Sequence, residues 1–200
     1  MTLPTDKAEL RRAMRKLRRR LAEHTPAAGV MAAQVLARHG IPAPPGAALA
    51  GRPVFSTYWF HGSEMPTNFL REFLLASGWR EAMPTAVSLE VPLSFRAFMS
   101  GDPLGPDLFN LPAPLAGAAE LPPDLLIVPL LAFDRRGGRL GQGGGLYDRT
   151  LANLRATKPV FVLGLAYAAQ ELEEVPMETH DQRLDAILTE TAFIAVAREG

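Results

Sequence analysis

The most informative segment of the chain reads Asp124-Leu-Leu-Ile-Val-Pro-Leu-Leu-Ala-Phe133 and continues as Asp134-Arg-Arg-Gly-Gly-Arg-Leu-Gly-Gln-Gly-Gly-Gly-Leu-Tyr-Asp148. The first half is a continuous apolar run, which is typical of a strand buried on both faces of a parallel sheet. The second half is a glycine-rich loop that leads into a helix expected at 147–155. The segment therefore predicts a buried strand, a glycine loop and a helix in succession.

Strands and helices alternate on either side of this segment. Pro159 to Ala166 reads as another buried strand, and Pro66-Thr67 opens a helix that stops at Gly78. The other elements we expect are helices at 7–21 and 26–39, a loop at 41–51, strands at 52–60, 79–83, 86–89, 93–98 and 186–189, and an extended connection at 100–123. This alternation predicts one α/β domain over residues 1–200, with a mixed, largely parallel sheet flanked by helices on both faces in three layers.

The glycine loop has the composition of an anion-binding turn. Six of the nine residues from Gly137 to Gly145 are glycine. Glycines reach positive φ, so successive N–H groups can converge on an anion at a helix start. Arg139 adds a cation, and Asp148 could hold Mg²⁺ against phosphate oxygens. The sequence has no Gly-Lys dipeptide and so no Walker A loop, and position 146 lacks the third glycine of a dinucleotide fingerprint. A flexible surface loop with Asp148 as a helix-dipole partner is the alternative.

The first expected helix is strongly basic. Asp6 can cap it, and Leu10, Met14, Leu17 and Leu21 form one apolar stripe. The helical period places Lys7, Arg11 and Arg18 beside that stripe, at the rim of the core. The remaining basic residues are expected on a solvated face: Arg12, Arg15, Lys16 and Arg19.

Overall composition excludes several classes of protein. The 200 residues carry no net charge and include no cysteine, which rules out disulfides, thiol catalysis and cysteine-bound metals. No apolar run approaches the length of a membrane span. Asp6 and Glu9 argue against a basic transit peptide, so we expect a cytoplasmic protein with no membrane partner.

Several segments of the sequence resemble those of a known family. Arg139-Leu-Gly-Gln-Gly-Gly-Gly-Leu-Tyr-Asp148-Arg149 is similar to the glycine signature of the 5-formyltetrahydrofolate cyclo-ligases, also called methenyltetrahydrofolate synthetases. Four further segments resemble the family and occur in the family's order along the chain: Lys7-Ala-Glu-Leu-Arg11, 58–64, 128–134 and 178–190. The resemblance spans about residues 6–194.

The resemblance implies an enzyme that consumes ATP with Mg²⁺. The family converts 5-formyltetrahydrofolate to 5,10-methenyltetrahydrofolate and releases ADP and phosphate. Phosphorylation of the formyl oxygen would make it a leaving group, and the folate N10 could then attack the same carbon. Positioning and charge neutralisation are the main tasks left to the protein. The expected partners are a reduced folate and ATP, the expected state is a monomer, and nucleic acid is not an expected partner.

The family's site residues carry over to matching positions. Lys7, Arg11 and Arg139 would hold the ATP phosphates, and Asp148 and Asp181 would bind Mg²⁺. The remaining nucleotide-lining residues would be Leu140, Gly141, Gln142, Gly143, Gly144, Gly145, Leu146 and Tyr147. The folate would contact Arg11, Trp59, Glu64, Gln142, Gly143, Gly144, Gly145 and Leu146.

One position departs from the family pattern and keeps alternatives open. The family usually has an aromatic residue where this chain has Leu146. A weaker folate site would leave room for an ATP-dependent enzyme that acts on a related N-formyl compound. A non-catalytic RNA- or nucleotide-binding protein on the same scaffold is the other alternative, although an RNA binder would not require the acids Glu64, Asp148 and Asp181.

Overall fold

A computed structural model describes residues 6–44 and 51–197. Its centre is a seven-stranded sheet in the order β11-β10-β9-β6-β1-β2-β3. The five strands from β10 to β2 run parallel, and β11 and β3 pair antiparallel at the two edges. The strands are β1 (Val54–Ser56), β2 (Arg80–Thr85), β3 (Ser94–Phe98), β6 (Leu125–Pro129), β9 (Phe161–Leu165), β10 (Ala186–Leu188) and β11 (Phe193–Ala195). The expected mixed, largely parallel sheet is confirmed.

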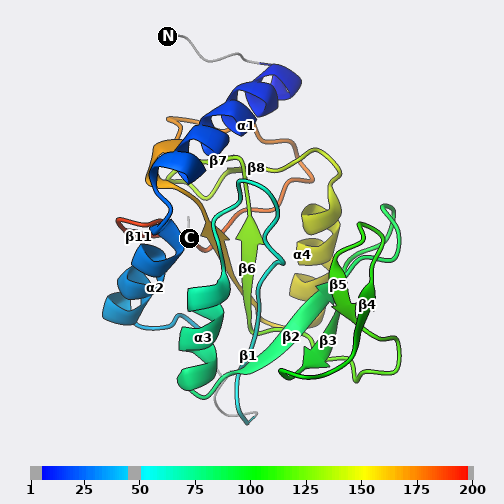
Figure 1. The fold of residues 1–200 in the computed structure, drawn as a ribbon. Coiled ribbons are helices and arrows are strands. Elements are labelled where there is room, and N and C mark those ends of the chain that lie inside the picture. Colours follow the sequence, from blue (N-terminus) through cyan, green and yellow to red (C-terminus); the bar gives the residue numbers. More distant parts are fainter. Residues whose placement is uncertain (1–5, 45–50, 198–200) are drawn as a thin grey trace.

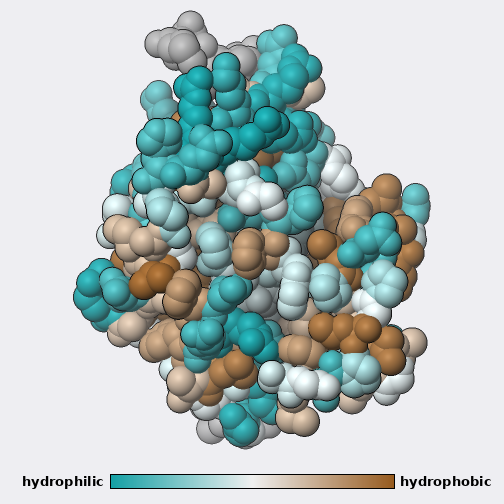
Figure 2. All heavy atoms as spheres, in the orientation of Figure 1, coloured by the Kyte–Doolittle hydropathy of each residue, from teal (hydrophilic) through white to brown (hydrophobic). Residues whose placement is uncertain are grey.

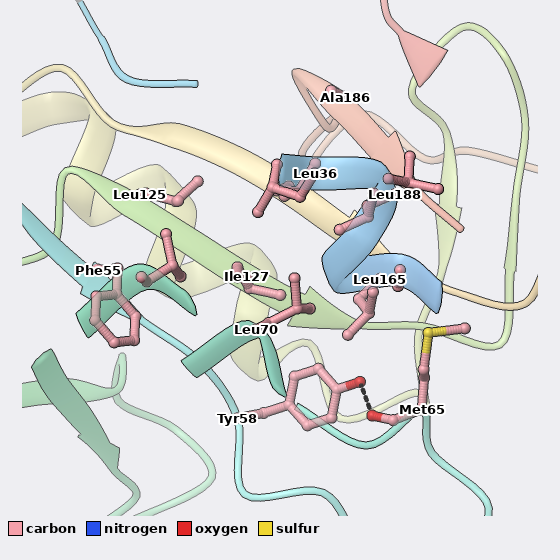
Figure 3. Packing of buried hydrophobic residues seen from close by; sticks show 14 of the residues in the cluster. Leu36, Phe55, Tyr58, Met65, Leu70, Leu125, Ile127, Leu165, Ala186 and Leu188 are labelled. Carbon is pink, nitrogen blue, oxygen red and sulfur yellow. Dashed lines mark hydrogen bonds between the residues drawn. The ribbon is translucent and has the colours of Figure 1, made fainter. Parts of the chain in front are cut away.

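Helices cover both faces of this sheet, which confirms the three layers (Figure 1). Helices α2 (Ala28–His39) and α3 (Asn68–Ala76) pack on one face, where Phe55, Leu125 and Leu188 are fully buried (Figure 3). Helix α4 (Leu146–Thr157) packs on the other face through Leu151 and Leu154. Successive strand residues point to opposite faces, so the apolar runs of β6 and β9 supply both cores.

Helix α1 (Lys7–His24) lies across the carboxyl end of the sheet (Figure 1). Asp6 caps it by accepting a hydrogen bond from the Glu9 N–H at 2.9 Å. Its Leu10 and Met14 are buried in a third core with Leu131 and Leu140. The apolar stripe expected from the sequence therefore fastens α1 over the strand ends, where its flanking basic residues face inward.

Several expected elements are shorter than the sequence pattern indicates. The run 124–133 divides into β6 and the short β7 (Ala132–Phe133), because Pro129 has no N–H to continue the ladder. Strand β7 pairs instead with β8 (Arg139–Leu140), which lies inside the segment expected to be loop. The strand expected at 52–60 is regular only over β1.

Other differences lie at the edges of the fold. No strand forms at 86–89, and the connection 100–123 contains a hairpin of β4 (Leu104–Pro106) and β5 (Pro112–Pro114). Helix α2 begins after a turn over 25–27, and Phe69 on α3 faces solvent rather than the core. A short 3₁₀ helix, η2 (Ala168–Gln170), follows β9. Most of the loop expected at 41–51 lies outside the described residues. Within the described ranges, no helix has both the length and the apolar character needed to span a bilayer.

Candidate active site

A cavity of about 690 Å³ opens at the carboxyl end of the parallel strands, beneath α1. Ligands of open α/β sheets bind at this end of the strands. All the site residues expected from the sequence line this one cavity: Lys7, Arg11, Trp59, Glu64, Arg139, Leu140, Gly141, Gln142, Gly143, Gly144, Gly145, Leu146, Tyr147, Asp148 and Asp181. The structure thus brings together residues from the two ends of the chain.

The glycine loop connects β8 to the first turn of α4. Gly143 and Gly145 have φ values of 104° and 63°, a region that favours glycine. In the described part of the chain, the N–H groups of residues 142–145 donate to no protein acceptor. The first N–H groups of α4 follow directly and are free as at any helix start. The loop therefore lines the cavity with residues whose N–H groups have no protein acceptor within the described ranges.

Arginine side chains hold this loop by its oxygen atoms. Arg11 Nε donates to the Gly141 carbonyl at 3.1 Å, and Arg15 Nε donates to Gln142 Oε1 at 2.9 Å. Arg149 donates to the Gly144 carbonyl at 2.7 Å. Arg15, which was expected on a solvated face, makes exposed hydrogen bonds to the loop, which it reaches because it stands one helical turn after Arg11. We predict that the loop is mobile without ligand, and full protection of its N–H groups from hydrogen exchange in the empty protein would contradict this.

Asp134 shapes the turn that precedes the loop. Its buried carboxylate accepts hydrogen bonds from the N–H groups of Arg136 and Gly138 at 2.9 Å each, and from the N–H of Val175 at 2.8 Å. The interactions fix the β7–β8 hairpin and join it to the segment after η2. Asp134 therefore orders the start of the glycine-rich segment and lies outside the cavity.

Ion pairs neutralise the charges at the loop end of the cavity. Lys7 Nζ lies 2.9 Å from Asp181 Oδ2 and 2.8 Å from Glu178 Oε1, and Arg139 lies 2.5 Å from Asp148 Oδ1. Burial opposes the charged form of Lys7, but its two carboxylate partners outweigh burial and raise its pKa. The Arg139 Nε is buried and has no hydrogen-bond acceptor within the described residues. Both cations at this end are thus held in ion pairs, and the Arg139 Nε donor remains without an acceptor among the residues that the structure describes.

The acids of this region suit a magnesium ion that is shared with phosphate. Asp148 and Asp181 supply carboxylate oxygens, which Mg²⁺ prefers. In the described ranges, no group of three acidic or histidine side chains could enclose a metal ion without other ligands. Mg²⁺ commonly binds through one or two carboxylates together with substrate phosphates and water. The residues therefore fit a metal that arrives with a nucleotide.

The opposite end of the cavity follows strand β1. Tyr58 is buried, and its hydroxyl donates to the Met65 carbonyl at 2.8 Å, which closes the 58–65 segment into a compact loop (Figure 3). Glu64 Oε2 accepts a hydrogen bond from the His61 N–H at 3.0 Å. Burial raises the pKa of Glu64, and the His61 N–H and the nearby Arg18 oppose that rise. Trp59 remains 44% exposed at the rim, where its ring is free to cover a ligand.

Apolar side chains complete this end. Met83 and Leu93 come from β2 and the turn before β3, while Leu89 and Phe109 come from the irregular segments at 86–93 and 107–111. Phe109 is 48% exposed. Figure 2 shows brown, hydrophobic spheres gathered over the β4–β5 lobe beside the cavity, and teal spheres over α1. The cavity is therefore charged beneath α1 and apolar beside the hairpin.

Several lining residues received no role from sequence reasoning, among them Arg18, Tyr58, Phe109 and Glu178. For Arg18 a signal existed, because the helical period placed it in the sector of Lys7 and Arg11. Glu178 stands three residues before Asp181, at the start of the turn that carries it. Phe109 had no signal, since it lies in a Pro-rich connection whose short β4–β5 strands show no strand pattern in the sequence.

Comparisons with known proteins agree with the geometry. A model of the 5-formyltetrahydrofolate cyclo-ligase family matches residues 4–190. A Mycolicibacterium smegmatis protein with the name 5-formyltetrahydrofolate cyclo-ligase is 33% identical over 164 residues, which cover 76% of this chain and 81% of that protein. A Haemophilus influenzae protein of the same name is 39% identical over 100 residues, covering 48% of this chain and only 53% of that protein.

Solved structures show the same architecture. The Aquifex aeolicus 5,10-methenyltetrahydrofolate synthetase matches with a TM-score of 0.73 and 25% identity, covering 97% of this chain and 94% of that chain. The Mycoplasma pneumoniae 5,10-methenyltetrahydrofolate synthetase matches with a TM-score of 0.70 and 22% identity, covering 93% and 99%. At 22% identity, the match to the Mycoplasma pneumoniae protein shows a shared fold alone.

Proposed function

The chain belongs to the 5-formyltetrahydrofolate cyclo-ligase family, and from that premise we propose that it converts 5-formyltetrahydrofolate to 5,10-methenyltetrahydrofolate with ATP and Mg²⁺. We propose further that the chain does so as a single domain. The observation that carries this function is the division of one cavity into a charged end with unused N–H donors and a more apolar end that contains Glu64. A triphosphate suits the first end and a pterin ring suits the second.

The nucleotide would lie along the glycine loop. Lys7, Arg11 and Arg139 would bind its phosphates, with the N–H groups of Gly141–Leu146 and the start of α4 beside them. Leu140 and Tyr147 would complete this wall. The unpartnered Arg139 Nε supports an anion at this place, because a buried donor without an acceptor is costly.

The ion pairs would change partners when the nucleotide enters. In the structure, Lys7 and Arg139 neutralise Asp181 and Asp148. Phosphate oxygens would take over the two cations, and the two carboxylates would then be free to hold Mg²⁺. The ion would supply charge neutralisation at the phosphates. Lys7, Arg139, Asp148 and Asp181 would each have an oppositely charged partner both with and without the nucleotide. Such pairing matters because an unpaired buried charge is strongly destabilising.

The folate would occupy the other end. Trp59 would cover the ring at the rim, and Glu64 would accept N–H bonds from the pterin. Arg11 and residues Gln142–Leu146, which line the same cavity, would contact both substrates. This placement would direct the formyl group of the folate toward the outermost phosphate.

The reaction then has two displacements. The formyl oxygen attacks the terminal phosphorus of ATP, and the bond from that phosphorus to ADP breaks. N10 attacks the formyl carbon, the carbon–oxygen bond breaks, and phosphate leaves with the formyl oxygen and the N10 proton as hydrogenphosphate. The protein holds both partners in line and neutralises the phosphate charge, which can supply a large part of the acceleration.

A product assay tests this function. The purified protein should form methenyltetrahydrofolate, followed by its absorbance, from 5-formyltetrahydrofolate only when ATP and Mg²⁺ are both present. A folded protein that binds both substrates and forms no product would refute the proposal. Tight, salt-sensitive RNA binding without ATP turnover would instead support the non-catalytic alternative.

A further inference from the structure

Arg18 is a buried cation on α1 that lines the folate end of the cavity. The proposed reaction gives it no role. Its side chain is 9% exposed. The guanidinium Nε donates to Ser63 Oγ at 3.1 Å, and NH1 donates to the Leu130 carbonyl at 3.5 Å. The same NH1 lies 3.5 Å from Glu64 Oε1. Arg18 thus reaches the loop that carries Glu64 and the chain just beyond β6.

Glu64 needs such a cation, because its side chain is 14% exposed. A buried carboxylate without a partner takes up a proton and stops being a charged acceptor. Burial does raise the pKa of Glu64, and the His61 N–H, the Arg18 guanidinium and the His61 ring act against that rise. The phenols of Tyr58 and Tyr147 also face this carboxylate, and burial raises the pKa of both, so they stay neutral. Among these groups, Arg18 is the permanent positive charge.

The two carboxylate oxygens of Glu64 have different partners. Oε2 accepts from the His61 N–H at 3.0 Å, and Oε1 faces Arg18. Each carboxylate oxygen can accept two hydrogen bonds. Both oxygens therefore keep a position for a ligand that offers adjacent N–H donors, as a pterin ring does.

We propose that Arg18 is a positioning residue that acts through Glu64, holding its carboxylate charged and turned into the cavity so that it can bind the pterin of a reduced folate. The inference rests on the proposed function, since it needs the folate at this end. In this arrangement Arg18 lines the cavity, and its guanidinium is engaged by Ser63, Leu130 and Glu64. Its effect should appear in folate affinity and in the pH dependence of that affinity, and should be absent from ATP affinity.

A simpler role would be structural, because Arg18 also ties α1 to Ser63 and Leu130. A double-mutant cycle separates the two roles. Calorimetry would measure 5-formyltetrahydrofolate binding to the wild type, Arg18→Met, Glu64→Gln and the double variant, from pH 5.5 to 8. The side-chain amide in the Glu64→Gln variant cannot titrate in this range and needs no cation.

The expected result is a loss that depends on Glu64. Arg18→Met should weaken folate binding by about 10- to 100-fold, as expected for a charged hydrogen bond. The loss should grow as the pH falls, because Glu64 without Arg18 binds a proton at a higher pH. In the Glu64→Gln background, Arg18→Met should cost no more than about twofold. An equal loss in both backgrounds would overturn the inference.

Matched variants control for charge and folding. Arg12→Met removes the same charge from an exposed position on the same helix, and should leave folate binding within about twofold. Arg18→Lys keeps the charge and should retain the wild-type pH profile, even if Arg18→Met fails to fold. A Lys variant with the pH profile expected of Arg18→Met would contradict the inference. Absence of folate binding by the wild type would instead refute the proposed function.

Discussion

The two ends of the cavity are built in opposite ways. The phosphate end combines the glycine loop and the start of α4 with α1 and the turn at 178–181, and its ion pairs Lys7–Asp181 and Arg139–Asp148 are already formed. The folate end combines side chains from several separate segments, and its acid Glu64 lies beside the cation Arg18. The first end can exchange its ion partners when a charged ligand arrives, whereas the second end must keep its carboxylate charged without any ligand.

The largest expected difference between the ends comes from Asp148. Asp148→Asn removes a proposed metal oxygen and should lower the rate of product formation at least ~100-fold, because metal-site substitutions commonly cost that much. The Asn side chain can still accept from Arg139, so the fold should persist. Single-turnover product formation measures the rate, and calorimetry with 5-formyltetrahydrofolate should show affinity within about twofold of the wild type. An unchanged rate would remove Asp148 from the metal site.

A smaller effect at the same end is expected from Lys7. Lys7→Met should weaken ATP binding by about 10- to 100-fold through loss of a charge-assisted hydrogen bond to phosphate. Equilibrium binding of a non-hydrolysable ATP analogue provides the measurement, and the exposed Lys16→Met on the same helix is the control. Equal affinities of both variants for the analogue would show that Lys7 does not contact the phosphates.

The folate end should respond to pH. The pKa of Glu64 lies above its usual 4.5, mainly because of burial. As the pH falls below that raised pKa, Glu64 becomes protonated, and folate affinity should fall by up to about tenfold per pH unit. Affinity should be constant above it. Glu64→Gln should give weaker binding with no such dependence, and a titration that persists in this variant would assign the effect to another group.

The smallest effect is expected at Leu146, between the two ends. Leu146→Phe restores the aromatic residue usual in the family and should strengthen folate binding by about threefold, as an added ring contact would. ATP affinity should not change. Competition between 5-formyltetrahydrofolate and other N-formyl compounds measures the selectivity of both forms. If the wild-type protein prefers another N-formyl compound, that compound would replace 5-formyltetrahydrofolate as the proposed substrate.

The same contrast explains how much could be predicted from the sequence. Elements with local signals were correct: the buried strands β6 and β9, the α1 helix with its cap at Asp6, and the glycine loop before α4. Local periodicity also placed Lys7 and Arg11 on one side of α1, and the structure brings both to the loop end of the cavity.

What could not be predicted depends on contacts between distant segments. The β4–β5 hairpin has three-residue strands that contain proline, so the local sequence pattern does not indicate them. Phe109 reaches the cavity through that hairpin. The contact of Arg15 with Gln142 joins residues 127 positions apart, so its residue type alone suggested a solvated face.

Oxygen transfer tests the central claim most directly. The protein would be supplied with 5-formyltetrahydrofolate labelled with ¹⁸O in the formyl group, together with ATP and Mg²⁺, and mass spectrometry would measure the label in the released phosphate. If the terminal phosphoryl group is transferred to the formyl oxygen, each phosphate should carry the ¹⁸O atom and the water should carry none. Unlabelled phosphate formed together with methenyltetrahydrofolate would contradict the account.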